Sequence, residues 1–285
     1  MAGVALFQAV ERFAQSTRSI PDDLLEREWK WGDYEEGVRF AFFRVYEELR
    51  QLAAALEAMR AVSAKPLTPA QRIIRQYHAA YRDLDAVLLS ADHNKIQVPP
   101  ADGEWSLWDI LLHMIEAEQS FFAINIYALE GARRQDGRTE EMSEEDWHSL
   151  WSGDPFQQIR ANENYAELLS YYDHLHQRVI ETFADVTTEE LRLPVPFWEG
   201  THMPLQFRLH RFDSHLRQHT IQAEKALSAT GQSPSEAQRL LRLIYAALAQ
   251  AEGNAIGLAG FASSEQAEVA RLIAGYTAEI APLLA

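Results

Sequence analysis

The stretch that decides the fold is residues 105–131, WSLWDILLHMIEAEQSFFAINIYALEG. As a helix it would make about seven turns, and apolar side chains would lie on nearly every side of it. A helix that is apolar all round is buried centrally, with other helices around it. The sequence therefore predicts a helical bundle with this segment in its middle.

Three further long segments can surround this helix. A helix capped by Thr68 and starting at Pro69 carries an apolar seam with alternating spacings of four and three, and residues 165–183 carry another. A third long helix ends near Gly231. The apolar period is close to 3.6 throughout, with no convincing period-2 stretch. Four long helices joined by one or two long loops predict a four-helix bundle, so the fold class is predicted to be all-α.

The segments on either side of the bundle are predicted to be helical as well. Helices are expected near residues 3–16, 33–60, 234–251 and 263–281, and the polar, acidic residues 133–155 are expected to form a loop. We expect an N-terminal helical extension (1–66), the bundle (67–231) and a C-terminal helical extension (232–285) that could pack with 1–66. The similarity of EWKWGD at 28–33 to EWSLWD at 104–109 leaves a degenerate second bundle half as an alternative.

Composition narrows the class of protein. The 285 residues are 47% hydrophobic, enough for a full core. With 42 acidic and 26 basic residues the net charge is −16, which opposes binding to nucleic acid or to an anionic membrane. No window approaches 18 uncharged apolar residues, and the start MAGVALFQAVERFAQ lacks a basic segment and a long apolar run, so we expect a cytoplasmic protein without membrane partners. The absence of cysteine leaves histidine and carboxylate as the strong metal ligands.

Three histidines fall where a metal site would need them. His215 and His219 are four residues apart, which puts both imidazoles on one helical face, one turn apart. His113, near the middle of the apolar helix, can supply a third ligand from a facing helix. Three protein ligands leave positions open for water or substrate, as catalytic sites require. Three imidazoles suit zinc, nickel, iron and copper. The alternative for His113 alone is a core histidine with a hydrogen-bond partner.

Several short motifs together resemble one known family. EWS at 104–106, DILLH at 109–113 and HLRQH at 215–219, followed by QAEKAL at 222–227, are similar to the DinB-like (damage-inducible) family over about residues 67–231. Proteins of that family are four-helix bundles, often dimeric, in which one histidine of the second helix and two of the fourth bind a divalent metal. The resemblance implies that His113, His215 and His219 are the ligands and that the chain could form a homodimer.

The resemblance also implies an activity. Relatives include thiol-dependent transferases and isomerases that use mycothiol or bacillithiol, and the metal-binding part of ergothioneine-forming sulfoxide synthases. Those synthases look like HxxxHxE, whereas this chain has Ile221 at the last position, and it lacks the glutamate of the HExxH protease motif. We expect a metal-dependent enzyme of the thiol-dependent transferase type, with a low-molecular-weight thiol as external nucleophile. The alternative is a non-catalytic metal-binding or stress-response scaffold.

Other residues near the histidines are candidates for catalysis or substrate binding. Asp109 and Glu116 lie one turn either side of His113 and could orient a ligand or act as a base; their alternative is a solvated helix edge. Arg208 and Arg211 precede the histidine pair and could hold an anionic group of a small-molecule substrate, although exposed salt bridges are the commoner role of arginine. Trp198, in the Pro-rich loop before that helix, could form part of a lid.

Overall fold

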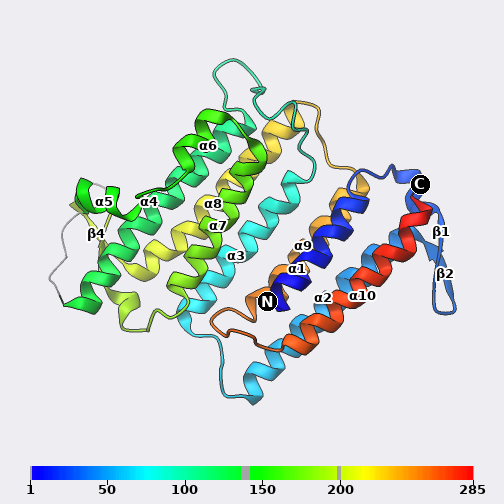
Figure 1. The fold of residues 1–285 in the computed structure, drawn as a ribbon, viewed down its shortest axis with the longest axis horizontal. Coiled ribbons are helices and arrows are strands. Elements are labelled where there is room, and N and C mark those ends of the chain that lie inside the picture. Colours follow the sequence, from blue (N-terminus) through cyan, green and yellow to red (C-terminus); the bar gives the residue numbers. More distant parts are fainter. Residues whose placement is uncertain (1, 136–141, 198–199, 285) are drawn as a thin grey trace. The chain divides into compact units, whose positions relative to one another are not determined.

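The computed structural model describes residues 2–135, 142–197 and 200–284 (Figure 1). Its long elements are all helices, so the predicted all-α class is confirmed. The longer helices are α1 (Ala2–Thr17), α2 (Val38–Val62), α3 (Pro69–Leu88), α4 (Leu107–Arg134), α7 (Tyr165–Phe183), α8 (Leu205–Ala229), α9 (Glu236–Gly253) and α10 (Ser263–Ile280). The shorter ones are α5 (Glu144–Leu150), α6 (Phe156–Asn162) and the 3-10 turns η1 (Asp22–Glu26), η2 (Glu190–Arg192) and η4 (Ala281–Leu283).

A hairpin precedes α2 and corrects the predicted start of that helix. Strands β1 (Glu28–Trp31) and β2 (Tyr34–Gly37) pair in antiparallel register, so the prediction of a helix from residue 33 is wrong and α2 begins at Val38. Gly32 takes a positive φ of 58° in the two-residue turn, which glycine adopts at little cost. A Cβ on Gly37 would lie 2.6 Å from the carbonyl oxygen of Leu25, so only glycine fits at this position.

The two long connections of the bundle are more ordered than expected. The Pro-rich connection before α8 contains a second hairpin of β3 (Pro194–Pro196) and β4 (His202–Pro204). The prediction of a loop over residues 133–155 is wrong in part, because α5 lies within it. The hydroxyl of Ser143 accepts a hydrogen bond from the backbone N–H of Asp146, which caps the first turn of that helix.

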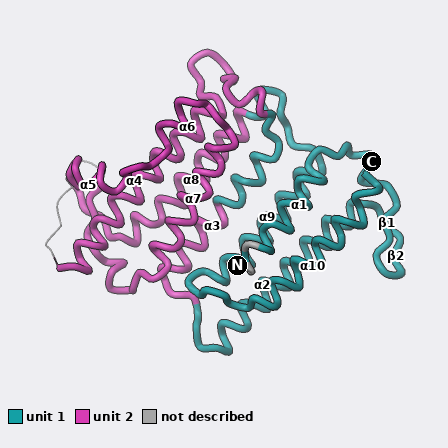
Figure 2. The backbone as a smooth tube through the Cα atoms, in the orientation of Figure 1, with its two compact units in different colours: residues 1–66, 81–92, 227–285 teal, residues 67–80, 93–226 magenta. Residues whose placement is uncertain are grey.

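The chain divides into two compact units, shown in Figure 2. Unit 1 comprises residues 1–66, 81–92 and 227–285, and unit 2 comprises residues 67–80 and 93–226. The first part of α3 therefore belongs to unit 2 and its last part to unit 1.

Unit 2 is the four-helix bundle, and its helices meet at a buried polar group. The Glu118 carboxylate of α4 accepts hydrogen bonds from the Tyr77 hydroxyl of α3 (2.5 Å) and the Tyr172 hydroxyl of α7 (2.6 Å). The Tyr77 ring lies 5.3 Å from the ring of Phe212 on α8. All four side chains are at most 1% exposed. Beside them, His78 is buried and its Nδ1 lies 2.9 Å from Nε2 of His176, so it is a core histidine.

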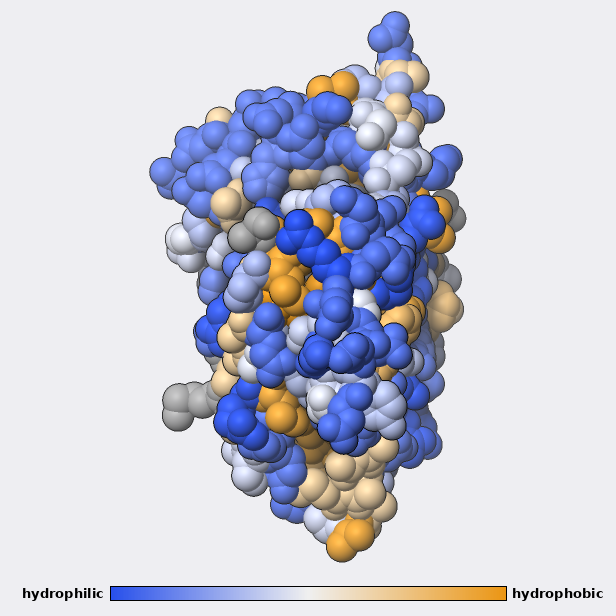
Figure 3. Space-filling view, turned by 90° about the vertical axis from the view of Figure 1, so that its right-hand side faces the viewer, coloured by the Kyte–Doolittle hydropathy of each residue, from blue (hydrophilic) through white to orange (hydrophobic). Residues whose placement is uncertain are grey.

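Unit 1 has a separate apolar core built by α1, α2, α9 and α10, which run side by side in Figure 1. Helix α1 packs along α10 and α2 along α9, with Phe13 and Phe42 in edge-to-face contact at 5.1 Å. The face drawn in Figure 3 is mostly hydrophilic with smaller apolar patches. Among the described residues, no helix is long and apolar enough to cross a bilayer.

Candidate metal centre

The start of α4 is fixed by a capping box that sets the position of His113. The Ser106 hydroxyl accepts a hydrogen bond from the backbone N–H of Asp109 (3.2 Å), and the Asp109 carboxylate accepts one from the backbone N–H of Ser106 (3.1 Å). These bonds satisfy N–H groups that a helix start leaves open. His113 follows one turn after Asp109, on the same side of the helix, and is half-buried.

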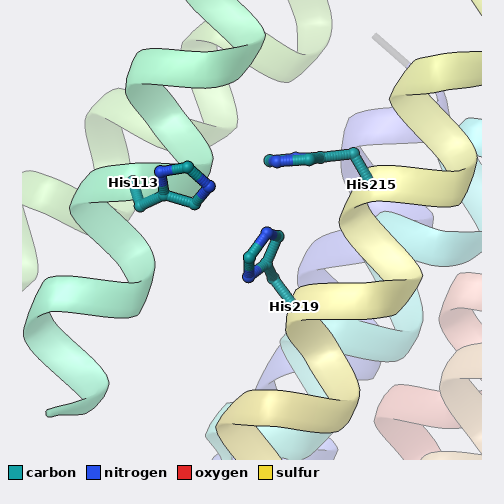
Figure 4. Close-up of side chains that lie close together, drawn as sticks. All are labelled: His113, His215 and His219. Atoms are coloured by element: carbon teal, nitrogen blue, oxygen red, sulfur yellow. The ribbon is translucent and has the colours of Figure 1, made fainter. Parts of the chain in front are cut away.

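The other two histidines are held by the packing of α8. Leu209, Phe212 and Leu216 are fully buried, which fixes the side of α8 that faces the bundle. His215 and His219 are 7% and 6% exposed and point toward His113 (Figure 4). One ring nitrogen of each of the three histidines lies within 4.8 Å of the others. The structure therefore brings the three predicted residues together from two facing helices.

Aromatic rings surround the three imidazoles. The Trp105 ring centroid lies 5.0 Å from that of His113 and stacks at 18° on His219, 6.5 Å away. The Phe121 ring makes an edge contact with His215 at 5.3 Å. Phe121 is buried, whereas Trp105 is 44% exposed and forms the solvent side of the cluster. The histidines thus lie between an apolar wall and a half-exposed indole.

Burial keeps His215 and His219 neutral at physiological pH. Burial, together with the smaller effects of the neighbouring His219, His113 and Arg211, lowers the pKa of His215 to about 3. Burial also lowers the pKa of His219, against the opposing effect of its hydrogen bond with Gln222. A neutral imidazole keeps the lone pair that a metal ligand must donate.

The hydrogen bonds of the imidazoles fit a metal ion. Nδ1 of His219 lies 2.8 Å from Oε1 of Gln222, which can only accept a hydrogen bond, so Nδ1 carries the proton and Nε2 has the lone pair. Nδ1 of His215 is buried and has no hydrogen-bond partner among the described residues. A buried imidazole nitrogen without a partner is costly, and a metal ion is one group that would satisfy this cluster. Among the described residues, no carboxylate joins the three histidines.

The two predicted catalytic carboxylates have other partners. Asp109 is exposed and bonded within the capping box of α4. Glu116 is partly exposed and forms an ion pair with Arg160 of α6. Neither belongs to the group of ligand atoms formed by the histidines.

The predicted substrate-binding residues differ in their surroundings. Arg208 is buried, 3% exposed, and lines a cavity of unit 2. Arg211 is half-buried, and its Nη1 donates a hydrogen bond to the Ser214 hydroxyl (3.3 Å). Trp198 lies outside the described residues.

Three residues of the site were not assigned a role from the sequence. Trp105 belongs to the EWS motif, and Phe121 to the apolar stretch 105–131, but neither pattern indicates a contact with the histidines. Gln222 lies three residues after His219, a spacing that places both on one helical face and could have indicated the contact.

Together these observations define a class of protein: an all-α bundle that gathers three imidazoles from two facing helices. In comparison with known families, residues 76–223 match the model described as DinB superfamily. The match covers more than half of the 285 residues and contains all three histidines, and the chain belongs to the DinB superfamily. No curated protein and no solved structure matched the chain.

Proposed function

We propose that this protein binds one divalent metal ion at His113, His215 and His219 and that it is a metal-dependent enzyme of the thiol-dependent transferase type. The observation that carries the proposal is the convergence of three imidazoles whose ligand nitrogens lie within 4.8 Å of one another. A set of three protein ligands is typical of catalytic metal sites, since it leaves a coordination position for substrate.

When bound, the ion would supply Lewis acidity that lowers the pKa of a coordinated thiol. The chain has no cysteine, so a nucleophilic thiol would come from a small molecule. In this proposal Phe121 excludes water from one side of the site, and Gln222 holds the proton on Nδ1 of His219. Asp109 is a positioning residue that fixes the start of α4. Glu116 keeps a partly exposed carboxylate and is the candidate proton acceptor.

Metal analysis tests the first half of the proposal. The purified chain, reconstituted with zinc and dialysed, should carry about one ion per chain, and His215→Ala should abolish stoichiometric binding because one of three ligands is lost. The matched control is His148→Ala, since the His148 side chain is 74% exposed and lies outside the cluster. A parent protein without stoichiometric metal, or a His215→Ala variant that retains it, would remove the proposal.

A turnover assay tests the second half. The zinc-loaded protein should accelerate the reaction of a small thiol, such as glutathione or cysteine, with an electrophilic aryl chloride, in which the thiol sulfur replaces chloride and a proton is released. His113→Ala should lose this rate while it keeps the fold. The advantage over the uncatalysed reaction should grow as the pH falls from 8.5 toward 7, where a free thiol with a pKa of about 8.5 is mostly protonated. Stoichiometric metal without turnover across a panel of thiols and electrophiles would favour the non-catalytic scaffold.

A further inference from the structure

Unit 2 contains a cavity whose lining does not include the three histidines. Its volume is about 590 Å³, within the range of roughly 300–1,000 Å³ that small-molecule sites occupy. The lining is mainly apolar, from α4, α5 and the end of β3. The side chains that matter for its chemistry are Ile124, Tyr127, Trp147, Phe197 and Arg208.

Arg208 is the only basic residue among the described residues that line this cavity. Its side chain is 3% exposed, and its guanidinium lies over the rings of Phe197 (5.2 Å) and Phe121 (5.7 Å). No carboxylate of the described residues forms an ion pair with it, and its Nε has no hydrogen-bond partner among them. The aromatic rings therefore hold the charge in place but do not neutralise it.

Arg82, another buried arginine of this protein, shows by comparison how a guanidinium with a structural role is neutralised. Arg82 is also 3% exposed, but its Nη1 lies 2.8 Å from Asp85 and its Nε 2.9 Å from Glu252. These carboxylates raise the pKa of Arg82, whereas burial and the neighbouring Arg211 lower the pKa of Arg208. A buried charge without a counter-ion destabilises the fold, and such a cost is typical of binding sites.

We infer that this cavity binds a small molecule with an apolar body and a single oxyanion, a carboxylate or a phosphate monoester, and that Arg208 is the counter-ion of that group. The planar guanidinium can donate two parallel hydrogen bonds to an oxyanion. Ile124, Tyr127 and Trp147 provide apolar surface for the body. The one carboxylate of the lining, Glu144, is 91% exposed, so solvent screens its charge.

Phe121 links the arginine of the cavity to the histidine cluster. The Phe121 ring lies 5.7 Å from the Arg208 guanidinium and 5.3 Å from the His215 ring. Arg208 lies seven positions before His215 on α8, about 10 Å along the helix. The inference that the cavity holds a substrate rests on the proposed function. The inference that it binds an oxyanion does not, because this binding requires no metal.

Calorimetric titration of the full chain with 4-phenylbutyrate tests the inference, because this probe combines one carboxylate with an apolar body. The parent should bind it about ten- to a hundredfold more tightly than the neutral amide, 4-phenylbutanamide, since hydrogen bonds to a charged group are worth that much. Arg208→Met should lower the affinity for the acid by a similar factor and leave that for the amide unchanged. A parallel titration with 4-phenylbutyl phosphate shows which oxyanion is preferred.

Two controls separate a binding role from a structural one. Arg178→Met removes another guanidinium that lies over aromatic rings, those of Phe122 and Trp151, but does not line the cavity, so it should leave affinity unchanged. Arg208→Met should unfold at the same or a higher urea concentration than the parent, because it removes an uncompensated charge.

The outcomes distinguish this inference from the proposed function. In His113→Ala without metal, 4-phenylbutyrate should still bind with the affinity of the parent. Equal binding of acid and amide by the parent would overturn the inference, as would an Arg208→Met variant that binds the acid normally. A loss of stability in Arg208→Met would assign this arginine to the fold, and the inference would again be overturned.

Discussion

The buried carboxylate of Glu118 makes the stability of the bundle depend on pH in a direction that one substitution can isolate. Glu118 is fully buried, and burial raises its pKa from 4.5 to about 7, although the hydrogen bonds from Tyr172 and Tyr77 act in the opposite direction. The perturbation is Glu118→Gln. A glutamine amide can accept a hydrogen bond from one tyrosine and donate one to the other, as the protonated acid can, but it does not titrate.

The sign and size of the change in stability follow from the pKa values of Glu118 in the unfolded chain and in the folded protein. Between pH 4.5 and about 7 the folded protein binds a proton at Glu118 that the unfolded chain has lost, so stability falls as the pH rises through this window. The whole change amounts to about 3 kcal/mol, at 1.36 kcal/mol for each pKa unit, and most of it falls between pH 5 and pH 8. Glu118→Gln should therefore match the parent at pH 5 and be more stable by about 2 to 3 kcal/mol at pH 8.

Urea unfolding of both proteins at pH 5, 6, 7 and 8, with a chelator present, measures this difference. The lowered pKa values of His215 and His219 act with the opposite sign, because they reduce stability as the pH falls, but they are shared by both proteins and cancel. If the free-energy difference between variant and parent stays constant within about 0.5 kcal/mol, the error of such comparisons, the argument for a raised pKa at Glu118 is refuted.

Two further predictions concern packing and the histidine cluster. Leu111→Ala should cost about 2–5 kcal/mol in the free energy of unfolding, because the side chain is fully buried in α4; Leu243→Ala, at a side chain 47% exposed, should cost less than about 0.5 kcal/mol in the same urea titration. Gln222→Ala should weaken zinc binding about 10- to 100-fold, because His219 loses the hydrogen-bond partner of its Nδ1. A competition titration measures the dissociation constant for zinc. An unchanged constant would show that Gln222 does not orient His219.

The long helices could be predicted because their apolar residues repeat many times. Leu111 and Ile115 on α4, Leu168 and Leu175 on α7 and Leu216 on α8 lie on the inferred inward seams, and all are buried. The helical repeat likewise places His215 and His219 on one helical face. A pattern that extends over several turns is informative because chance matches are rare over that length.

The short elements could not be predicted in the same way. Each strand of the β1–β2 hairpin has four residues, too few to show a clear alternation. Helix α5 has only seven residues, about two turns, and the spacing of Ser143 and Asp146 is the signal for its start.

The surroundings of the histidines depend on contacts that spacing does not encode. Asp109 shares a helical face with His113, but its carboxylate is also three residues after Ser106, and the capping box determines where it lies. Trp105 stacks on His219, a contact that the packing of α4 against α8 creates. The burial of Arg208 over two aromatic rings likewise follows from tertiary packing.

The discontinuous composition of unit 1 has a consequence for the order of events during synthesis. Residues 1–66 supply α1 and α2, but their packing partners α10 and α9 lie in residues 227–285. The apolar faces of α1 and α2, with Leu6, Phe13 and Phe42, stay uncovered until the ribosome has made residues 227–285. Most of unit 2 is one continuous stretch, residues 93–226, so we expect it to fold first, while the first two helices remain open to chaperones or to premature association.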